Sequence, residues 1–479
     1  MVKDKKHALT FDDVSIIPGY SQVLPGDIDV STRLTKSIKL KIPIISAAMD
    51  TVTEEKMAIA MAQQGGIGII HQYLPPEEQA EQVRKVKRFE SWIIENPITI
   101  EPDETVGAVG KIMKDNEISG IPVVENKKLV GIITKRDIRF IEKDELTVKE
   151  LMTKDLVTVP EKITRDEAKR ILQKNKIEKL LVTGKKGELR GLITVKDIMK
   201  KEKYSEATRD INGRLLVGAA VGVLDKKRIE MLYKSGVDVI VVDSAHGHSK
   251  NVLDTIRMIK KDFDISVIGG NVVTPEGTED IIAAGADAVK VGLGSGSICT
   301  TRVVTGIGIP QITAIESCSE VADKHDIPII SDGGIRQYGD IAKAIAAGAS
   351  SVMIGGLLAG AEEAPSKKVL LEGRLYKEYR GMGSEGALEK KYGPGRYFGS
   401  IKGKTVPEGV EGLVDFIGSV PEVLHDMVGG LKHAMGYSGT KNLEEFKKKA
   451  VLIEVSTGGQ QEAHPTVKIT KEPRNYRSF

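Results

Sequence analysis

Short apolar runs rich in Val and Ile alternate with helix-like segments along both outer parts of the chain. Most of these runs are continuously apolar, as expected for parallel strands that are covered on both faces. Each run leads into Gly, Asp or Ser, which are residues that favour turns. Eight such runs occur, at 43–50, 67–72, 215–222, 238–247, 266–274, 287–294, 327–335 and 351–356.

The segments between these runs have the spacing of amphipathic helices, and several end in glycine. TEEKMAIAMAQQG, KRIEMLYKSG and YGDIAKAIAAG each finish in Gly, the residue that commonly follows a helix in a left-handed conformation. Eight strand–helix units in one α/β chain predict a (β/α)8 TIM barrel. A doubly wound parallel sheet is the alternative.

The barrel pattern is interrupted after the second run, where an internal repeat occupies residues 93–203. GIITKRDI begins at Gly131, and GLITVKDI begins 60 residues later at Gly191. Each copy predicts the order strand, helix, strand, strand, helix. The repeat is therefore expected to form an inserted domain, which divides the chain into 1–92, 93–203 and 204–479.

This repeat pair resembles a tandem of cystathionine-β-synthase-type (CBS) modules, or Bateman domain. The resemblance implies adenine or guanine nucleotide effectors bound between the copies. Asp137 and Asp197 would meet ribose hydroxyls, and Thr134 and Thr194 would meet phosphates. The alternative is that the pair only packs and provides a scaffold.

Composition is that of a globular protein without a global charge preference. Of the 479 residues, 40% are hydrophobic and 29% are charged, and the formal net charge is only +3. This balance gives no indication of nucleic-acid or anionic-membrane binding. Two cysteines are too few for a disulfide framework, and neither a signal peptide nor a membrane-length apolar run is visible. We therefore expect a cytoplasmic protein.

The sixth apolar run leads into VGLGSGSICTTR, which contains one of the two cysteines, Cys299. The glycines of this loop allow the backbone to curve tightly. A thiol flanked by hydroxyl groups and Arg302 is a candidate nucleophile. The alternative is a small buried apolar residue, which is the role we predict for Cys318 in AIESCSEVADKH.

Glycine-rich turns follow the seventh and eighth runs, where barrels commonly bind phosphate. They are SDGGI, which contains Asp332, and IGG, which contains Gly355 and Gly356. Asp332 is expected to bind ribose hydroxyls or to cap the following helix. Asp243, in DSAHGHS after the fourth run, is suited to a second ribose.

Three other motifs are rejected as sites. His246 and His248 lack a third ligand, so we predict no metal ion there. GMGSEG (381–386) matches a dinucleotide-binding pattern, and GSIKGKT (399–405) approaches a phosphate-binding loop, but neither follows an apolar strand. The long polar segment 380–440 instead predicts a functional lid.

With these motifs in place, the chain resembles the inosine-5′-monophosphate dehydrogenase family over nearly its whole length. GSGSICTTR, SDGGI, YRGMGS, GRYF and GVEG occur in the family's order. The resemblance implies oxidation of inosine monophosphate to xanthosine monophosphate with NAD, which commits purines to guanine nucleotides. The family binds the dinucleotide on barrel loops, so no Rossmann fold is required.

The resemblance also implies how the reaction proceeds. Cys299 would attack C2 of the base, hydride would pass to NAD, and water would hydrolyse the resulting thioimidate. Arg396 would be the general base on a mobile flap beside Tyr397, although the pKa of an arginine exceeds about 12 in water and such a role needs a protected site. Thr301, relayed to Glu411, is a second route.

The same resemblance assigns the ligand contacts. NAD would be bound by Asp243, Asn271, Gly292 and Gly294. The substrate would be bound by Ser297, Asp332, Gly334, Gly355, Gly356, Tyr379, Met382, Gly383 and Glu411. A potassium ion would be held by carbonyl groups of Gly294, Gly296 and Cys299 and of Glu462, Ala463 and His464 from a neighbouring subunit, which implies a homotetramer.

The sequence departs from the family at two ligand positions. Gly356 stands where many members have Ser, and Ala245 stands where some have a hydroxyl. The nearest alternative function is that of guanosine monophosphate reductase, which uses NADPH and needs no water-activating flap. A catalytically silent nucleotide sensor is the alternative from another class, and the joint presence of Cys299, Thr301 and Arg396 argues against it.

Overall fold

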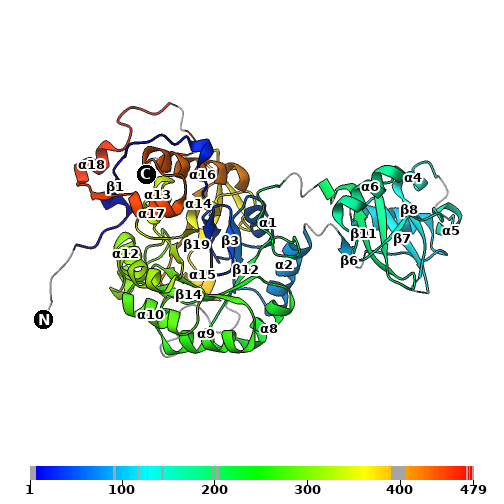
Figure 1. Cartoon of the computed structure of the whole chain (residues 1–479), viewed down its shortest axis with the longest axis horizontal. Helices are drawn as coiled ribbons and strands as arrows, with labels where there is room; N and C mark the ends of the chain where they lie inside the picture. The colour runs from blue at the N-terminus through cyan, green and yellow to red at the C-terminus, as the bar shows by residue number, and fades with distance from the viewer. Residues whose placement is uncertain are drawn as a thin grey trace. The chain divides into compact units, whose positions relative to one another are not determined.

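The computed structural model describes most of the chain as two compact units, drawn in Figure 1. The larger unit joins 1–89 to 206–479, and the smaller one comprises 90–205. The described residues are 7–89, 93–95, 97–116, 118–126, 128–141, 145–196, 198–199, 204–389, 406–470, 473 and 475–476.

Eight parallel strands close into a barrel in the larger unit. Each strand begins and ends within one of the eight predicted apolar runs, so the (β/α)8 prediction is confirmed and the doubly wound alternative is wrong. In their order around the barrel the strands are β12 (Gly218–Val221), β13 (Val239–Asp243), β14 (Ser266–Val272), β15 (Ala288–Val291), β16 (Ile329–Asp332), β17 (Ser351–Ile354), β4 (Ile44–Ser46) and β5 (Ile67–Ile70).

The barrel interior is filled by apolar side chains from these strands. Val241, Ile268, Ala288 and Ile330 belong to one buried cluster. Because side chains two residues apart on a strand point to the same side, the last inward position of several strands carries a polar group above this core. The apolar core therefore supports a polar layer at the carboxyl ends of the strands.

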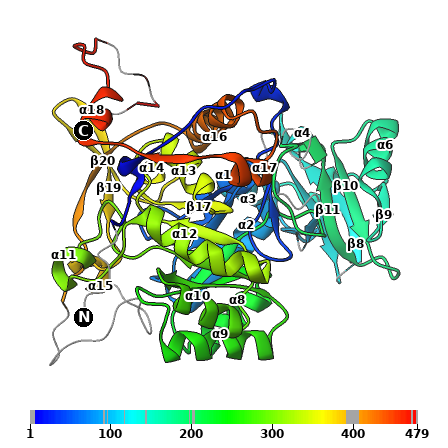
Figure 2. The ribbon, with the colours of Figure 1, turned by 60° about the vertical axis from the view of Figure 1, so that its left-hand side comes forward.

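Helices cover the outside of the barrel, and α8, α9 and α10 lie side by side in Figure 2. The predicted glycine stops are confirmed at Gly65, Gly236 and Gly348, whose φ angles of 92°, 82° and 119° are left-handed. The helices are α1 (Glu55–Gln63), α2 (Pro76–Phe89), α8 (Lys226–Lys234), α9 (Lys250–Asp262), α10 (Pro275–Ala283), α12 (Gln311–Ala322) and α13 (Gly339–Ala346).

The larger unit contains further strands and helices besides the eight strand–helix units. A three-stranded sheet in the order β18–β19–β20 follows the last barrel strand, and β1 pairs with β21. The sheets comprise β1 (Val14–Ile16), β2 (Thr32–Arg33), β3 (Lys39–Leu40), β18 (Lys368–Leu371), β19 (Arg374–Arg380), β20 (Glu411–Asp415) and β21 (Leu452–Glu454), and the helices α11 (Thr301–Thr305), α14 (Gly356–Ala359), α15 (Glu385–Glu389), α16 (Val420–Tyr437), α17 (Leu443–Lys449) and α18 (Thr457–Glu462).

The smaller unit contains the same succession of elements twice. A helix followed by two antiparallel strands occurs in each half, and each half has its own buried apolar cluster. Its elements are β6 (Ile94–Glu95), α3 (Val106–Asp115), β7 (Gly120–Glu125), β8 (Lys128–Thr134), α4 (Lys135–Ile138), α5 (Val148–Leu151), β9 (Thr158–Pro160), α6 (Arg165–Asn175), β10 (Lys179–Thr183) and β11 (Leu189–Thr194).

The nucleotide contacts expected in this unit are only partly described. Thr134 donates hydrogen bonds from its backbone amide and its hydroxyl to Asp137 Oδ2, both at 2.7 Å, so these two side chains cap α4. Asp197 lies outside the described residues. A role for these residues in nucleotide binding stays a prediction.

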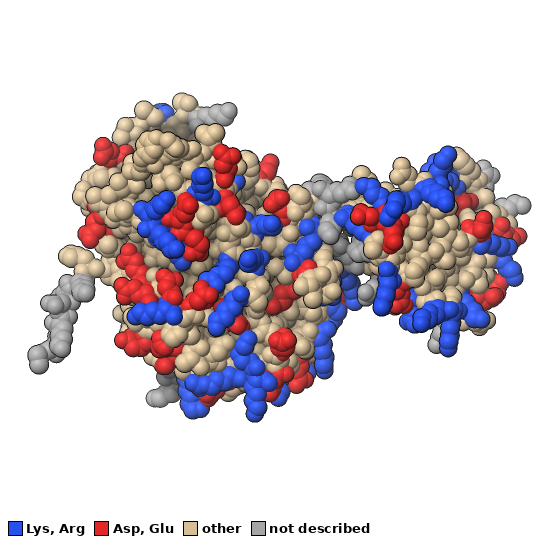
Figure 3. Space-filling model, in the orientation of Figure 1, with Lys and Arg blue, Asp and Glu red and all other residues tan. Residues whose placement is uncertain are grey.

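The surface carries both signs of charge. On the face shown in Figure 3, basic and acidic side chains are interspersed. Among the described helices, none has the length and apolar character needed to cross a membrane.

Candidate active site

A cavity opens at the carboxyl ends of the barrel strands. Its wall combines the loop after β15, the glycine turns after β16 and β17, and the start of the predicted lid. Most of the residues assigned from the sequence line it. They are Asn271, Gly292, Gly294, Gly296, Ser297, Cys299, Asp332, Gly334, Gly355, Gly356, Tyr379 and Met382.

The thiol of Cys299 lies beside two groups that can exchange protons. Its Sγ is 3.1 Å from the hydroxyl of Thr301, and that hydroxyl donates a hydrogen bond of 2.8 Å to Glu408 Oε2. Cys299 is partly exposed at the cavity, whereas Thr301 is buried. A nucleophile, a hydroxyl and a carboxylate thus form a continuous row at the cavity wall.

Backbone pairing holds this row together. The amide of Thr300 donates to the carbonyl of Glu408 at 3.1 Å, and the amide of Val410 donates to the carbonyl of Ile298 at 3.1 Å. The amide of Glu408 donates in turn to the carbonyl of Gly383 at 2.9 Å. The cysteine loop and the segment 406–410 are therefore positioned by each other, although more than 100 residues separate them.

The relay from Thr301 to Glu411 expected from the sequence is wrong. Glu411 Oε1 accepts from the hydroxyl of Ser384 and from the amide of Gly386, both at 2.9 Å, and this side chain does not line the cavity. Glu408, in contrast, accepts a hydrogen bond from Thr301 and lines the cavity. The two glutamates share the sequence EGVEG, and only the pairing of Glu408 with the cysteine loop distinguishes them.

Arg302 supports the cysteine loop through its own hydrogen bonds and also interacts electrostatically with Cys299. Its guanidinium donates to the carbonyl groups of Leu293 and Ile309, and its stem packs against Gly294 and Gly308. Burial lowers the pKa of Arg302. Arg302 therefore shapes the loop, and activation of the Cys299 thiol by its charge stays a prediction.

The glycine turns leave room where a phosphate is expected. A Cβ atom on Gly355 would lie 2.9 Å from the hydroxyl of Tyr379, and one on Gly356 would lie 3.1 Å from Ser297 Oγ. Burial raises the pKa of Tyr379 to about 12. The turn thus offers backbone amides together with neutral hydroxyl donors.

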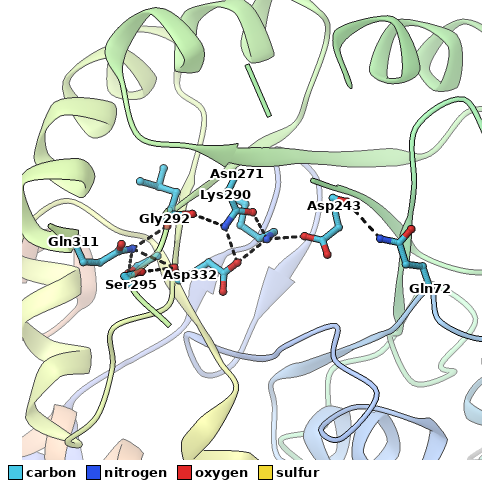
Figure 4. A network of polar contacts seen from close by, with 10 residues as sticks. Gln72, Asp243, Asn271, Lys290, Gly292, Ser295, Gln311 and Asp332 are labelled. Atoms are coloured by element: carbon cyan, nitrogen blue, oxygen red, sulfur yellow. Dashed lines mark hydrogen bonds and ion pairs between the residues drawn. The ribbon is translucent and has the colours of Figure 1, made fainter. Parts of the chain in front are cut away.

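A buried polar network, drawn in Figure 4, lies next to the cavity. Asn271 Nδ2 donates to Asp332 Oδ2 at 2.9 Å and to the carbonyl of Gly292 at 2.7 Å. Lys290 Nζ donates to Asp332 Oδ2 at 2.6 Å and to Asp243 Oδ1 at 3.0 Å. Asp332 therefore serves the network and does not cap α13. Asp243 does not line the cavity itself but is joined to it through Lys290.

Lys290 and Gln311 are members of this network that the sequence did not reveal. Lys290 stands inside an apolar run, and a charge at an inward position of a buried strand is the signal that could have revealed it. Gln311 Nε2 donates to the carbonyl of Val291 at 2.9 Å and to Ser331 Oγ at 3.3 Å, so it links the ends of β15 and β16. No sequence signal distinguishes Gln311 from other glutamines.

Comparison with known proteins decides the family. The model of the IMP dehydrogenase / GMP reductase domain matches residues 8–466. This chain belongs to that family. The inosine-5′-monophosphate dehydrogenases of Aquifex aeolicus and Bacillus subtilis are 54% and 51% identical to it, each over 99% of this chain and 98% and 99% of their own lengths.

Solved structures show the same fold. A GMP reductase from Trypanosoma brucei in complex with guanosine 5′-monophosphate has a TM-score of 0.90 and 39% sequence identity, over 97% of this chain and 98% of its own. The resemblance to the inosine-5′-monophosphate dehydrogenases that the motifs predicted is confirmed by the family model and by these relatives.

Several residues that the family resemblance singles out are not brought to this cavity by the described part of the chain. Arg396 and Tyr397 lie outside the described residues. His464 Nδ1 is 3.3 Å from the hydroxyl of Tyr476, and the amide of Ala463 donates to the carbonyl of Gln460, so both contacts lie within the C-terminal region.

The remaining candidates have contacts of other kinds. His248 Nε2 is 2.8 Å from Asp280 Oδ2, an exposed pairing away from the cavity. Cys318 is fully buried in α12, and burial raises its pKa to about 11. A protonated, buried thiol is what the structural role predicted for Cys318 requires.

Proposed function

We propose that this chain oxidises inosine 5′-monophosphate to xanthosine 5′-monophosphate with NAD, through a covalent adduct on Cys299. The row formed by Cys299, Thr301 and Glu408 carries the proposal, because it supplies both a nucleophile and a path for the proton of a second, hydrolytic step. The named dehydrogenases, at 50–54% identity over almost the full chain, favour this function.

The residues lining the cavity would orient a purine nucleoside monophosphate from its phosphate to its base. The phosphate would lie on the backbone amides of Gly334 and Gly356, with donors from Ser297 and Tyr379. Asp332 would accept from the ribose hydroxyls. The base would then reach Met382 and Gly383 next to the thiol of the nucleophile.

The chemistry divides into two steps. The Cys299 thiolate attacks C2 of the base, and bound NAD would supply the two-electron oxidation by taking up the C2 hydrogen with its bonding electrons. Water then attacks C2 of the thioimidate, and the C–S bond breaks to return the thiolate. The sum is inosine monophosphate, NAD⁺ and water converted to xanthosine monophosphate, NADH and a proton.

The second step needs a group that accepts a proton from water. Glu408 can receive it through the hydroxyl of Thr301, which already donates to its carboxylate. Arg396 on the predicted flap, with Tyr397 beside it, is the other candidate base. The two routes are not exclusive, and separate replacement of Glu408 and Arg396 distinguishes them.

NAD would use the second ribose site of the barrel mouth. Asp243 would accept from its ribose hydroxyls, with Asn271, Gly292 and Gly294 on the side facing the substrate. A potassium ion suits the carbonyl groups of the cysteine loop, because that donor set contains no carboxylate and oxygen dipoles are the ligands such ions prefer. Completion of this cage by Glu462, Ala463 and His464 of a second copy would make the protein a homotetramer.

The smaller unit is proposed to be a CBS pair that binds adenine or guanine nucleotides. The repeated helix–strand–strand order and the separate apolar cluster of each half support this assignment. Titration of the full chain with ATP and with GTP in a calorimeter tests it, and absence of binding heat for both nucleotides contradicts it.

A cytoplasmic location is proposed on the cysteine content.

The alternative function is reduction of guanosine monophosphate with NADPH. The solved reductase of Trypanosoma brucei shares the fold and favours it, although at 39% identity. One assay separates the two functions. NADH formation from inosine monophosphate, NAD and potassium supports the dehydrogenase, and NADPH consumption with guanosine monophosphate contradicts it.

A further inference from the structure

Lys290 is a buried cation at the end of the barrel core. It lies between the buried carboxylate of Asp243 and the partly exposed carboxylate of Asp332. Its side chain is 1% exposed, and its ammonium group contacts Asp243, Asn271 and Asp332. Lys290 does not line the cavity, whereas Asp332 and Asn271 do. Figure 4 shows the ammonium group between the two aspartates.

The fold explains why this side chain points inward. Ala288 belongs to the barrel interior, so Lys290, two residues further along β15, points to the same side. Gly270 on the neighbouring strand leaves the space, since a Cβ atom there would lie 2.7 Å from Lys290 Cβ. The register of β14 shifts between Gly270 and Val272, which makes Asn271 the extra residue of a bulge.

The ammonium group is fully used by this arrangement. A lysine has three N–H donors, and the three side chains Asp243, Asn271 and Asp332 each accept one. A buried carboxylate is costly unless it is paired and hydrogen-bonded. Here one cation pairs with two carboxylates that come from different strands, β13 and β16.

We propose that Lys290 is a positioning residue that couples the two ribose sites, by holding the substrate carboxylate Asp332 and the NAD carboxylate Asp243 in one hydrogen-bonded unit. This inference rests on the proposed function. Lys290 touches neither ligand and has no donor left for chemistry, so it acts only through the two aspartates. Loss of Lys290 weakens the binding of both ligands, whereas loss of a single ribose contact would weaken the binding of one.

The test compares two buried lysines in the full-length protein. Lys290→Met removes the cation and keeps the length of the side chain. Lys87→Met is the matched control, because Lys87 is also buried and pairs with two carboxylates, Asp210 at 2.9 Å and Asp238 at 2.8 Å. Asp238 precedes β13 and Asp243 ends it, so the control pair lies at the opposite end of the barrel.

Three quantities are measured for each variant. They are the melting temperature, the Kd for inosine monophosphate by calorimetry without NAD, and the KM for NAD at saturating substrate. Both variants lower the melting temperature. K290M raises both ligand constants at least about tenfold, as expected for the loss of hydrogen bonds to charged groups, and K87M leaves them within about twofold.

Two results overturn the proposal. One is a folded K290M protein in which either ligand constant stays within about twofold of wild type. The other applies if K290M does not fold. The variant Asp243→Asn is then compared with the double variant Asp243→Asn/Lys290→Met, because these two proteins differ only in the lysine and both keep the carboxylate of Asp332. Equal affinity of these two for inosine monophosphate contradicts a role in holding Asp332, and a loss of about tenfold in the double variant supports it. Failure of wild type to form NADH would instead contradict the proposed function.

Discussion

The hydroxyl group of Thr301 donates a hydrogen bond of 2.8 Å to the carboxylate of Glu408. The same hydroxyl lies 3.1 Å from the nucleophilic sulfur of Cys299. A water molecule that attacks an adduct on this sulfur is therefore within reach of a hydroxyl backed by a proton acceptor. Hydride transfer needs no such acceptor, so Thr301 and Glu408 concern the hydrolytic half of the reaction.

Replacing Glu408 by Gln tests this assignment. The amide keeps the size of the side chain but cannot take up a proton, so hydrolysis of the adduct slows and kcat falls at least about tenfold. The rate of NADH formation in the first turnover stays within about threefold of wild type. Stopped-flow absorbance then shows a burst of NADH followed by a slow steady rate.

Glu411→Gln is the matched control for this variant. Glu411 lies three residues further along the chain and accepts from Ser384 and Gly386, at the start of α15. Its kcat is expected to stay within about twofold of wild type. Equal loss of activity in both variants would contradict a specific role for Glu408.

Arg396→Gln addresses the second route to an activated water. If Arg396 is a base, the variant forms NADH in the first turnover and then hydrolyses the adduct slowly. The path through Thr301 and Glu408 remains, so the double variant Arg396→Gln/Glu408→Gln falls further than either single one. Single-turnover and steady-state rates measure this, and parallel loss of hydride transfer and hydrolysis in Arg396→Gln counts against the role.

The two thiols are expected to differ sharply in reactivity. Burial raises the pKa of Cys318 to about 11, so at pH 8 about one thiol in a thousand is ionised, and alkylating reagents attack the ionised form. Iodoacetamide at pH 8 should modify Cys299, with protection by inosine monophosphate, and spare Cys318. Cys299→Ala loses NADH formation, whereas Cys318→Ala keeps it. Mass spectrometry that finds Cys318 modified in the folded protein would refute this difference.

The raised pKa of Cys318 also predicts how stability depends on pH. The folded chain holds this proton up to about pH 11, whereas an unfolded chain releases it near the ordinary value of 9.0. The contribution of Cys318 to the free energy of unfolding is therefore complete below pH 9 and is lost as pH rises toward 11. Denaturant unfolding at pH 8 and pH 10.5 should show a smaller loss for Cys318→Ala than for wild type.

The barrel itself could be predicted because its information is local. Val and Ile runs with glycine stops at Gly65 and Gly236 reveal a buried parallel strand and a helix end without any knowledge of the partners. The choice between Glu408 and Glu411 is different in kind. It depends on backbone pairing with a loop more than 100 residues away, which no local pattern of EGVEG contains.

Lys290 marks the same limit for the site. Its position in an apolar run is visible in the sequence, but its proposed role depends on contacts with Asp243 and Asp332, which come from two other strands. Convergence of this kind is a property of the closed barrel. The residues assigned by motif, such as Ser297 and Tyr379, reach the cavity because the motif already encodes their place.

The phosphate end of the cavity gives a last prediction, on Tyr379. Tyr379→Phe removes one donor to the substrate phosphate, so the KM for inosine monophosphate rises about fivefold to tenfold while kcat stays within about twofold. Inosine, which lacks the phosphate, is processed equally by variant and wild type. Because the pKa of Tyr379 is about 12, the phenol keeps its proton and the KM of wild type shows no rise from its ionisation up to pH 10. Tyr376→Phe, on the same strand but outside the cavity, is the control. An unchanged KM in Tyr379→Phe, or an equal loss with inosine, would show that this hydroxyl does not contact the phosphate.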